Sequence, residues 1–195
     1  TSALPAEFLE RLRDIVPPSD YASVLAAFRG SRATSFRINT LQASTDEVLS
    51  GLSGVGISPD PVPWNPLAFT VGHDTRSALL ASPPYLEGSI YVQNLSSMIP
   101  PLVLAPKPGE RILDLTAAPG SKTLQMACMV GPESELAAVE VVKGRFFKLR
   151  DNLASQGAGF VRTFLRDGRS VWKHRPEYFD RVLLDAPCSS EGRFS

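Results

Sequence analysis

The chain has 195 residues, of which 43% are hydrophobic, and it balances 20 Lys and Arg against 20 Asp and Glu. This length can hold one large domain or two small ones with a buried core, and the composition argues against wholesale disorder. The two cysteines, Cys128 and Cys188, form no CxxC pair or Cys/His cluster. We therefore expect no disulfide framework, no metal site, and a reduced, cytoplasmic location. No apolar run approaches the ~20 residues of a membrane span, so we expect no membrane partner.

The charges are unevenly distributed along the chain. Residues 1–80 contain eight acidic and six basic side chains, whereas residues 143–181 contain ten basic and four acidic ones. A concentration of positive charge of this kind could contact a polyanion such as RNA. A solvated helix face with ordinary loops accounts for it equally well, so charge alone does not decide between the two.

The first part of the chain reads as a small α+β domain over residues 1–85. Ser44 followed by Glu47 is a capping box and predicts that a helix begins there. Apolar spacing predicts two earlier helices and several short strands. These elements lie at residues 8–16 and 24–28 for the helices, and at residues 35–39 and 62–71 for the strands, the last interrupted by Pro63 and Pro66.

The second part, residues 86–195, alternates short apolar runs with helical patterns. The runs predicted as strands are residues 112–115, 136–139, 160–164 and 181–184. Strands that alternate with helices indicate βαβ crossovers, and hence a parallel sheet in a doubly wound α/β domain.

Ligands of such a sheet bind beyond the carboxyl ends of its strands. The second predicted strand ends at Glu140, Asp167 follows the third, and Asp185 follows the fourth. Any one of these acids could be a helix cap or a loop residue, but three at successive strand ends indicate one shared site. A turn of mostly small residues follows the first strand, formed by Thr116, Ala117, Ala118, Pro119, Gly120, Ser121 and Lys122.

This turn matches neither of the common nucleotide-binding loops. A P-loop needs glycine where Ser121 and Thr116 stand, and no GxGxxG sequence is present. A nucleoside-bearing ligand without a pyrophosphate, S-adenosylmethionine, fits better. The small residues allow close approach to the backbone, and the next helix offers free N–H groups to a carboxylate. Glu140 could accept hydrogen bonds from ribose hydroxyls, and Asp167 from the exocyclic amino group of adenine.

Two motifs, Asp114–Thr123 and Asp185–Gly192, together resemble the RNA cytosine-5 methyltransferases of the Sun (nucleolar-protein) family. Tyr91–Met98 is similar to the stretch before that family's first strand, and Phe36–Leu41 to part of its N-terminal, RRM-like region. The N-terminal details resemble the bacterial 16S ribosomal RNA branch. The resemblance implies a Rossmann-like domain behind a small RRM-like one. It also implies S-adenosylmethionine-dependent methylation of cytosine C5 in RNA, with ribosomal RNA as the expected substrate and tRNA as the other candidate.

The resemblance also implies roles for individual residues. Residues 116–122 would lie under the methionine part of the cofactor, Glu140 would hold the ribose, and Asp167 the adenine. Asp185 would lie near the sulfonium and the target base, so it would both bind the cofactor and take part in catalysis. The thiol of Cys188 would point into the cleft and assist product release. Cys128, on the apolar face of a helix, is expected to be an inert core residue.

Members of the Sun family attack cytosine C6 with a second cysteine, in a Thr-Cys motif after a fifth strand. The sequence ends at Ser195 before such a motif. We therefore expect a sheet that is incomplete at its fourth strand, with an exposed edge that a missing segment or a second chain would complete.

The sequence is compatible with one alternative to RNA methylation and disfavours another. A non-catalytic RNA-binding or regulatory subunit could retain the same fold. Amino-group methyltransferases are disfavoured, because they tend to place an Asn/Asp-Pro-Pro-aromatic motif where this sequence has Asp185–Cys188.

Overall fold

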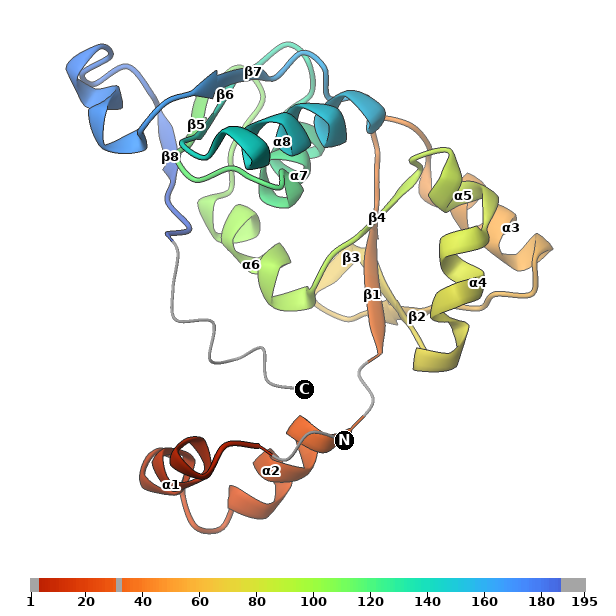
Figure 1. Ribbon diagram of the computed structural model, residues 1–195. Helices are drawn as coiled ribbons and strands as arrows, with labels where there is room; N and C mark the ends of the chain where they lie inside the picture. The colour runs from red at the N-terminus through yellow and green to blue at the C-terminus, as the bar shows by residue number, and fades with distance from the viewer. Residues whose placement is uncertain (1–3, 31–32, 187–195) are drawn as a thin grey trace. The chain divides into compact units, whose positions relative to one another are not determined.

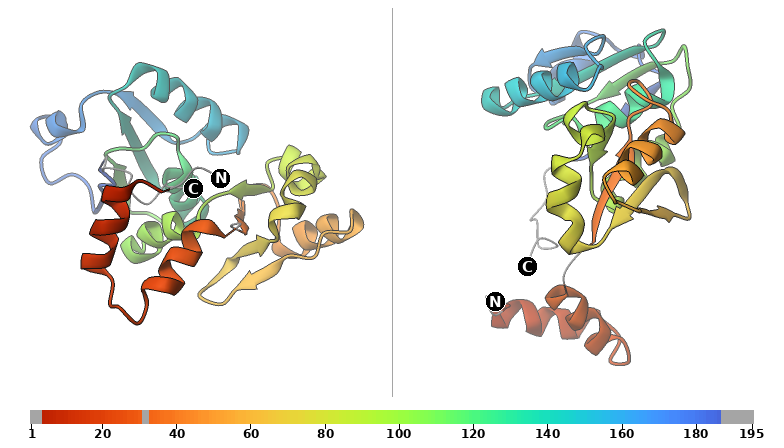
Figure 2. Two further views of the ribbon diagram at one scale, coloured as in Figure 1. Left: turned by 60° about the horizontal axis from the view of Figure 1, so that its bottom comes forward. Right: turned by 90° about the vertical axis from the view of Figure 1, so that its right-hand side faces the viewer.

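The computed structural model describes residues 4–30 and 33–186 (Figure 1). Residues 33–186 form one unit, and the helices within residues 1–32 belong to another. These two helices are α1 (Ala6–Ile15) and α2 (Tyr21–Arg29), which Figure 2 shows joined by a short turn. The rings of Phe8 and Phe28 meet edge to face, with centroids 5.2 Å apart. The helices predicted at residues 8–16 and 24–28 are confirmed.

The larger unit begins with an antiparallel sheet, which we call the N-terminal sheet. Its strand order is β2-β3-β1-β4, with β1 at Thr34–Ile38, β2 at Asp60–Val62, β3 at Asn65–Val71 and β4 at Ile90–Val92. Three helices flank it, α3 (Thr45–Gly54), α4 (Arg76–Ala81) and α5 (Pro83–Leu86), with the short 3-10 helix η1 (His73–Thr75) before α4 (Figure 1). Its core contains Phe36, Ile38, Leu52, Leu79 and Ile90.

Local sequence signals explain part of this sheet and its helices. The capping box at the start of α3 is confirmed, because the Ser44 side chain accepts from Glu47 N while the Glu47 carboxylate accepts from Ser44 N. The predicted break at Pro63 is also confirmed, since this residue lies between β2 and β3. The predicted break at Pro66 is wrong, since it lies inside β3. It precedes the residues that pair with β1, which begin at Ala68, so its missing N–H costs no hydrogen bond to that strand.

The rest of the larger unit is a parallel sheet of order β7-β6-β5-β8, which we call the parallel sheet. Its strands are β5 (Arg111–Asp114), β6 (Glu135–Glu140), β7 (Arg162–Leu165) and β8 (Arg181–Leu183). They alternate with α7 (Ser121–Val130), α8 (Lys143–Ser155) and the 3-10 helix η2 (Gly168–Lys173), and α6 (Leu95–Leu104) precedes them. The predicted doubly wound α/β fold is confirmed.

The parallel sheet is covered on both faces. Ile112, Leu136 and Ala138 pack with residues of α7 and α8, whereas Leu113, Ala137 and Val139 pack with Val171 and Phe179. Within the described residues β8 is an edge strand, as expected, and Val182 in this strand and Leu184 directly after it are exposed.

One predicted strand boundary in this sheet is wrong. The third strand begins at Arg162 rather than at residue 160. Val161 N donates to Ala158 O in a turn, and Phe160 packs against the core from that turn. The apolar residues Phe160 and Val161 belong to this turn, and for that reason the apolar pattern in the sequence predicted a strand that begins too early.

Buried polar side chains connect the two sheets. Arg37 Nε donates to Gln93 Oε1 at 3.0 Å, and Gln93 Nε2 donates to Gln125 Oε1 at 3.1 Å. Cys128 packs against the core of the parallel sheet. Its thiol also donates a hydrogen bond to Asn39 Oδ1, with Sγ and Oδ1 3.2 Å apart. The domain boundary at residue 85 stays a prediction; β4, which follows it, pairs with β1 of the N-terminal sheet. No helix in the described part of the chain is long and apolar enough to span a bilayer.

The connection between β5 and α7 has two unusual features. Gly120, which precedes α7, adopts φ 106°, and a Cβ added there would lie 3.0 Å from Leu149 Cδ1. Asp114, at the end of β5, is almost fully buried, and its carboxylate accepts from Thr123 Oγ1 at 2.7 Å and Thr116 N at 3.3 Å. Burial raises the pKa of Asp114 to about 6.

The first prediction concerns Gly120. Replacement Gly120→Ala should lower the free energy of unfolding by about 1–2 kcal/mol, because alanine is strained in the left-handed region and would crowd Leu149. The matched control is Gly144→Ala in α8, where nothing lies within 4 Å of the added Cβ. The control should lose no stability, since alanine favours a helix. Equal effects of the two changes in urea unfolding would contradict this account.

The second prediction concerns the pH dependence of stability. Because the folded-state pKa of Asp114, about 6, lies above its ordinary value of 3.8, the folded protein binds a proton that the unfolded chain does not bind in this range. The wild type should therefore gain stability relative to Asp114→Asn as pH falls from 7 toward 4, by up to about 3 kcal/mol. Urea unfolding of both proteins at several pH values measures the difference. A difference that stays constant with pH would rule out the raised pKa.

Candidate binding site at the strand ends

The carboxyl ends of the four parallel strands are tied to one another by backbone hydrogen bonds beyond the strands themselves. Leu115 N donates to Leu183 O at 2.9 Å, which holds the end of β5 against β8. Ala117 N donates to Val139 O at 2.9 Å, toward β6. Arg166 N donates to Glu140 O at 3.0 Å, so the end of β7 follows β6. The predicted site residues that follow these strands therefore share one edge of the sheet.

The loop after β5 is anchored on both sides. The Thr116 hydroxyl donates to Asp185 O at 2.9 Å, across to the segment after β8. From α8, Arg145 Nη2 donates to Ala118 O at 2.6 Å, and Asn152 Nδ2 donates to Pro119 O at 2.8 Å. No motif in the sequence indicates a role for Arg145 or Asn152 in this loop. Their spacing of two helical turns, which places both on one face of α8, is the signal that could have indicated it.

Glu140 lies at the end of β6, as predicted, and its side chain is 3% exposed. One carboxylate oxygen, Oε1, accepts from Val142 N at 2.8 Å. The other, Oε2, lies 3.6 Å from Arg145 Nη1. The carboxylate is thus held in a fixed orientation, and Oε2 has capacity for further hydrogen bonds.

Asp167 caps the short helix η2 and also binds Arg169. Its Oδ1 accepts from Arg169 N at 2.9 Å, and its Oδ2 accepts from Arg169 Nη2 at 2.7 Å. These hydrogen bonds from Arg169 hold the pKa of Asp167 below its ordinary value. The next residue, Gly168, approaches the end of β5 so closely that an added Cβ would lie 2.9 Å from Leu115 O. The segment after β7 therefore reaches over to β5, which brings Asp167 toward the loop at residues 116–122.

Asp185 follows β8 at the same edge. Its Oδ2 lies 2.6 Å from Lys122 Nζ, and its side chain remains 53% exposed. Lys122 belongs to the first turn of α7, so this ion pair connects the loop after β5 with the segment after β8. Cys188, whose thiol is predicted to point into the cleft, lies outside the described residues.

The first turn of α7 lies at this edge. No side chain among the described residues caps the helix, whose first residue is Ser121. Uncapped N–H groups at a helix N-terminus favour an anionic group. Within residues 4–30 and 33–186, no group of three or more His, Cys, Asp or Glu side chains is arranged to hold a metal ion.

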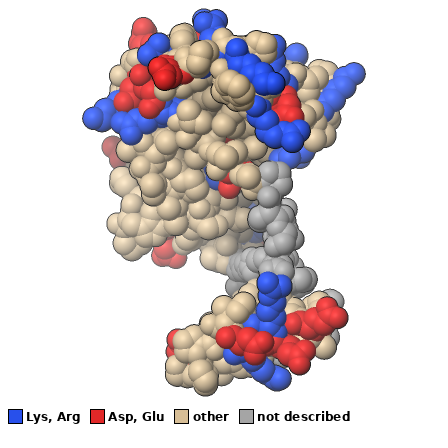
Figure 3. All heavy atoms as spheres, turned by 90° about the vertical axis from the view of Figure 1, so that its left-hand side faces the viewer, with Lys and Arg blue, Asp and Glu red and all other residues tan. Residues whose placement is uncertain are grey.

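The basic residues between residues 143 and 181 divide into two groups. Arg145, Arg162, Arg169 and Arg181 form ion pairs with carboxylates. The other six are exposed and form no ion pair with a described residue: Lys143, Lys148, Arg150, Arg166, Lys173 and Arg175. Figure 3 shows Lys and Arg gathered over the part of the surface that the parallel sheet and its helices form, with Asp and Glu between them.

Comparison with known protein families accounts for both parts of the chain. The family described as 16S rRNA methyltransferase RsmB/F matches residues 101–195. The N-terminal domain of 16S rRNA methyltransferase RsmF matches residues 4–95. Among curated proteins, the ribosomal RNA small subunit methyltransferase F of Pectobacterium atrosepticum is 38% identical over 98% of this chain. The chain spans about 40% of the length of that relative.

Solved structures agree with this assignment. A methyltransferase homolog protein from Pyrococcus horikoshii is 30% identical, with a TM-score of 0.79, over 95% of this chain and 64% of that one. NSun6 from Pyrococcus horikoshii, solved with SFG, has a TM-score of 0.82 over 94% of this chain and 71% of that one, and at 19% identity it supports the fold alone. The Rossmann-like methyltransferase fold and the resemblance to the Sun family are thus confirmed. Both parts of the chain thus match 16S rRNA methyltransferases, residues 4–95 the N-terminal domain of RsmF and residues 101–195 the RsmB/F family.

Proposed function

We propose that this chain is the N-terminal and cofactor-binding part of an S-adenosylmethionine-dependent methyltransferase that modifies cytosine C5 in 16S ribosomal RNA. The observation that carries the proposal is the convergence of one loop and three acids, from four different strands, on a single sheet edge. In bacteria 16S ribosomal RNA lies in the cytoplasm, so we also infer a cytoplasmic location.

The residues at this edge fit the chemical groups of S-adenosylmethionine. The uncapped first turn of α7 would receive the methionine carboxylate, next to the loop at residues 116–122. Glu140 Oε2 would accept from the ribose hydroxyls, and Asp167 would accept from the adenine amino group. The loop backbone can be approached closely because its residues are small, and Arg145 and Asn152 hold its carbonyl groups away on the α8 side.

The bound cofactor supplies an activated methyl group on a sulfonium. The chain's own residues hold the two reactants in place. Lys122 and Thr116 fix the segment that contains Asp185, by an ion pair and a hydrogen bond respectively. Asp185 would then face the sulfonium and the target base. Cys188, three residues further along the chain, would assist release of the methylated RNA.

The six exposed basic side chains support the RNA part of the proposal. Lys143, Lys148 and Arg150 lie on α8, and Arg166, Lys173 and Arg175 lie in or near η2. Exposed cations that no described carboxylate neutralises are available to phosphates, which provide most of the affinity for a nucleic acid.

The third prediction tests the ribose contact. Replacement Glu140→Gln should weaken S-adenosylmethionine binding by about 1.5–3 kcal/mol, because a charged acceptor is replaced by an amide. Isothermal titration calorimetry measures the affinity. The matched control is Glu133→Gln, which removes the same charge from an exposed position in the turn before β6. If both variants bind as tightly as the wild type, the ribose is held elsewhere.

The fourth prediction tests the role of Cys188 in the full-length protein. If Cys188 assists release, Cys188→Ala should still transfer the methyl group and form the covalent RNA adduct, but fail to resolve it. The adduct would then accumulate as a complex that survives denaturing electrophoresis. Cys128→Ala, which removes the other thiol of this chain, should leave the adduct short-lived. Loss of both adduct and methylation in Cys188→Ala would instead make Cys188 the nucleophile.

A further inference from the structure

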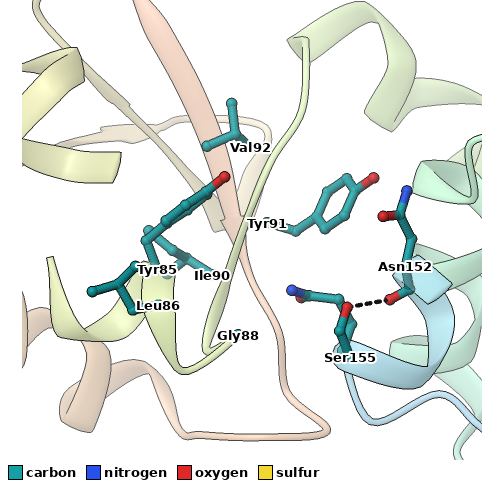
Figure 4. Close-up of a pocket in the computed structure, with 9 residues that line it drawn as sticks. Tyr85, Leu86, Gly88, Ile90, Tyr91, Val92, Asn152 and Ser155 are labelled. Carbon is teal, nitrogen blue, oxygen red and sulfur yellow. Dashed lines mark hydrogen bonds between the residues drawn. The ribbon is translucent and has the colours of Figure 1, made fainter. Parts of the chain in front are cut away.

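A pocket of about 410 Å³ lies beside β4, between α5 and α8 (Figure 4). Tyr85 belongs to α5, and Ile90 and Tyr91 belong to β4. Across the pocket, Asn152 and Ser155 extend from α8. None of its lining residues is charged, so the pocket suits a neutral group.

The pocket lies at a free edge of the N-terminal sheet. β4 is the last strand in the order β2-β3-β1-β4 and pairs with β1 alone among the described strands. Asn39 N donates to Ser89 O, and Gln93 N donates to Ser35 O, so Ser89 and Gln93 use their backbone groups toward β1. By the alternation of an antiparallel ladder, Ile90 and Val92 direct their N–H and C=O groups away from β1. Backbone donors and acceptors are thus available at the pocket.

Aromatic rings and amide groups line the same space. Figure 4 shows the rings of Tyr85 and Tyr91 on opposite sides of the β4 backbone. The Arg37 guanidinium lies 5.6 Å from the centroid of the Tyr91 ring, which helps to hold that ring in place. Asn152 and Gln156 add amide donors and acceptors. An unpaired nucleobase is a flat ring with hydrogen-bond donors and acceptors on its edge. Its face could stack on a tyrosine ring of the pocket, and its edge could bond to the amide groups.

The surroundings of the pocket supply the charge that a nucleic acid needs. Lys148 precedes Asn152 by four residues, so the two share one face of α8. The Lys148 side chain is exposed and forms no ion pair with a described residue. Asn152 itself donates to Pro119 O, so the pocket adjoins the loop of the candidate cofactor site. An RNA strand could thus place one base in the pocket and its phosphates along α8, toward the site.

We propose that this pocket binds one unpaired base of the RNA substrate, outside the nucleotide that is methylated. The proposal rests on the proposed function, since it assigns a further contact to the same substrate. The bound base would position the strand relative to the cofactor site.

The fifth prediction fills the pocket in the full-length protein. Ser155→Trp places a large ring on a lining position, whereas Ala154→Trp places the same ring on the neighbouring exposed position of α8 that does not line the pocket. Affinity for a single-stranded RNA that contains 4-thiouridine is measured by fluorescence anisotropy. Ser155→Trp should bind it about tenfold more weakly, the effect of losing one stacked base, and Ala154→Trp should bind as the wild type does. Photo-crosslinks of the wild type should map to Tyr85 or Tyr91.

Calorimetry with S-adenosylmethionine separates this proposal from the proposed function. If the wild type binds both cofactor and RNA, but Ser155→Trp and Ala154→Trp bind RNA equally, the pocket proposal is overturned and the function stands. If the wild type binds neither, the proposed function fails and the pocket proposal with it. An extended peptide that occupies the β4 edge without competing with RNA would also overturn the pocket proposal.

Discussion

The hydrogen bond from the Thr123 hydroxyl to the buried carboxylate of Asp114 is the contact on which the strand-end site depends. It joins the end of β5 to the first turn of α7 and so closes the loop at residues 116–122. Because β5 lies between β6 and β8, this loop contacts both neighbouring strand ends, through Ala117 N to Val139 O and through the Thr116 hydroxyl to Asp185 O. Burial of the carboxylate is unfavourable, as its raised pKa indicates, and the two hydrogen bonds that it accepts offset part of that cost. Gly120, whose positive φ any other residue would adopt only with strain, belongs to the same connection.

Helix α8 provides a common support for the loop at residues 116–122, the proposed cofactor site and the pocket. Arg145 contacts both Ala118 O and the carboxylate of Glu140, so one side chain relates the loop to the neighbouring strand end. Two turns later, Asn152 reaches Pro119 O and also lines the pocket. At the end of the helix, Gln156 O accepts from Asn39 Nδ2 at 2.9 Å, which ties α8 to the N-terminal sheet. A single rigid helix can therefore relate the proposed RNA contact on one sheet to the proposed cofactor contact on the other.

The junction between the two sheets is polar, which is unusual for so buried a place. Arg37 is 2% exposed, and its Nη2 has no hydrogen-bond partner among the described residues. Its Nε binds the Gln93 amide, which continues to Gln125 on α7. A chain of directional hydrogen bonds of this kind specifies one relative orientation of its members, which an apolar contact of equal area would not do. The orientation matters here because α7 begins at the end of the loop at residues 116–122, where we propose that the cofactor binds.

The sequence by itself determined the parallel sheet, the helices α1, α2 and α3, and the positions of the acids and small residues at the strand ends. These features depend on local patterns: apolar periodicity, the Ser44 capping box, and the residues that directly follow each strand. The sequence did not predict helix α6, because Pro100 and Pro101 interrupt its helical pattern. It did not predict β4, because three residues are too few to show the alternation of a strand. The roles of Arg145 and Asn152, the buried state of Asp114, and the pocket beside β4 were decided only by the tertiary structure. Each depends on residues far apart in the chain, and their approach is set by the packing of α8 against the sheet rather than by any local pattern.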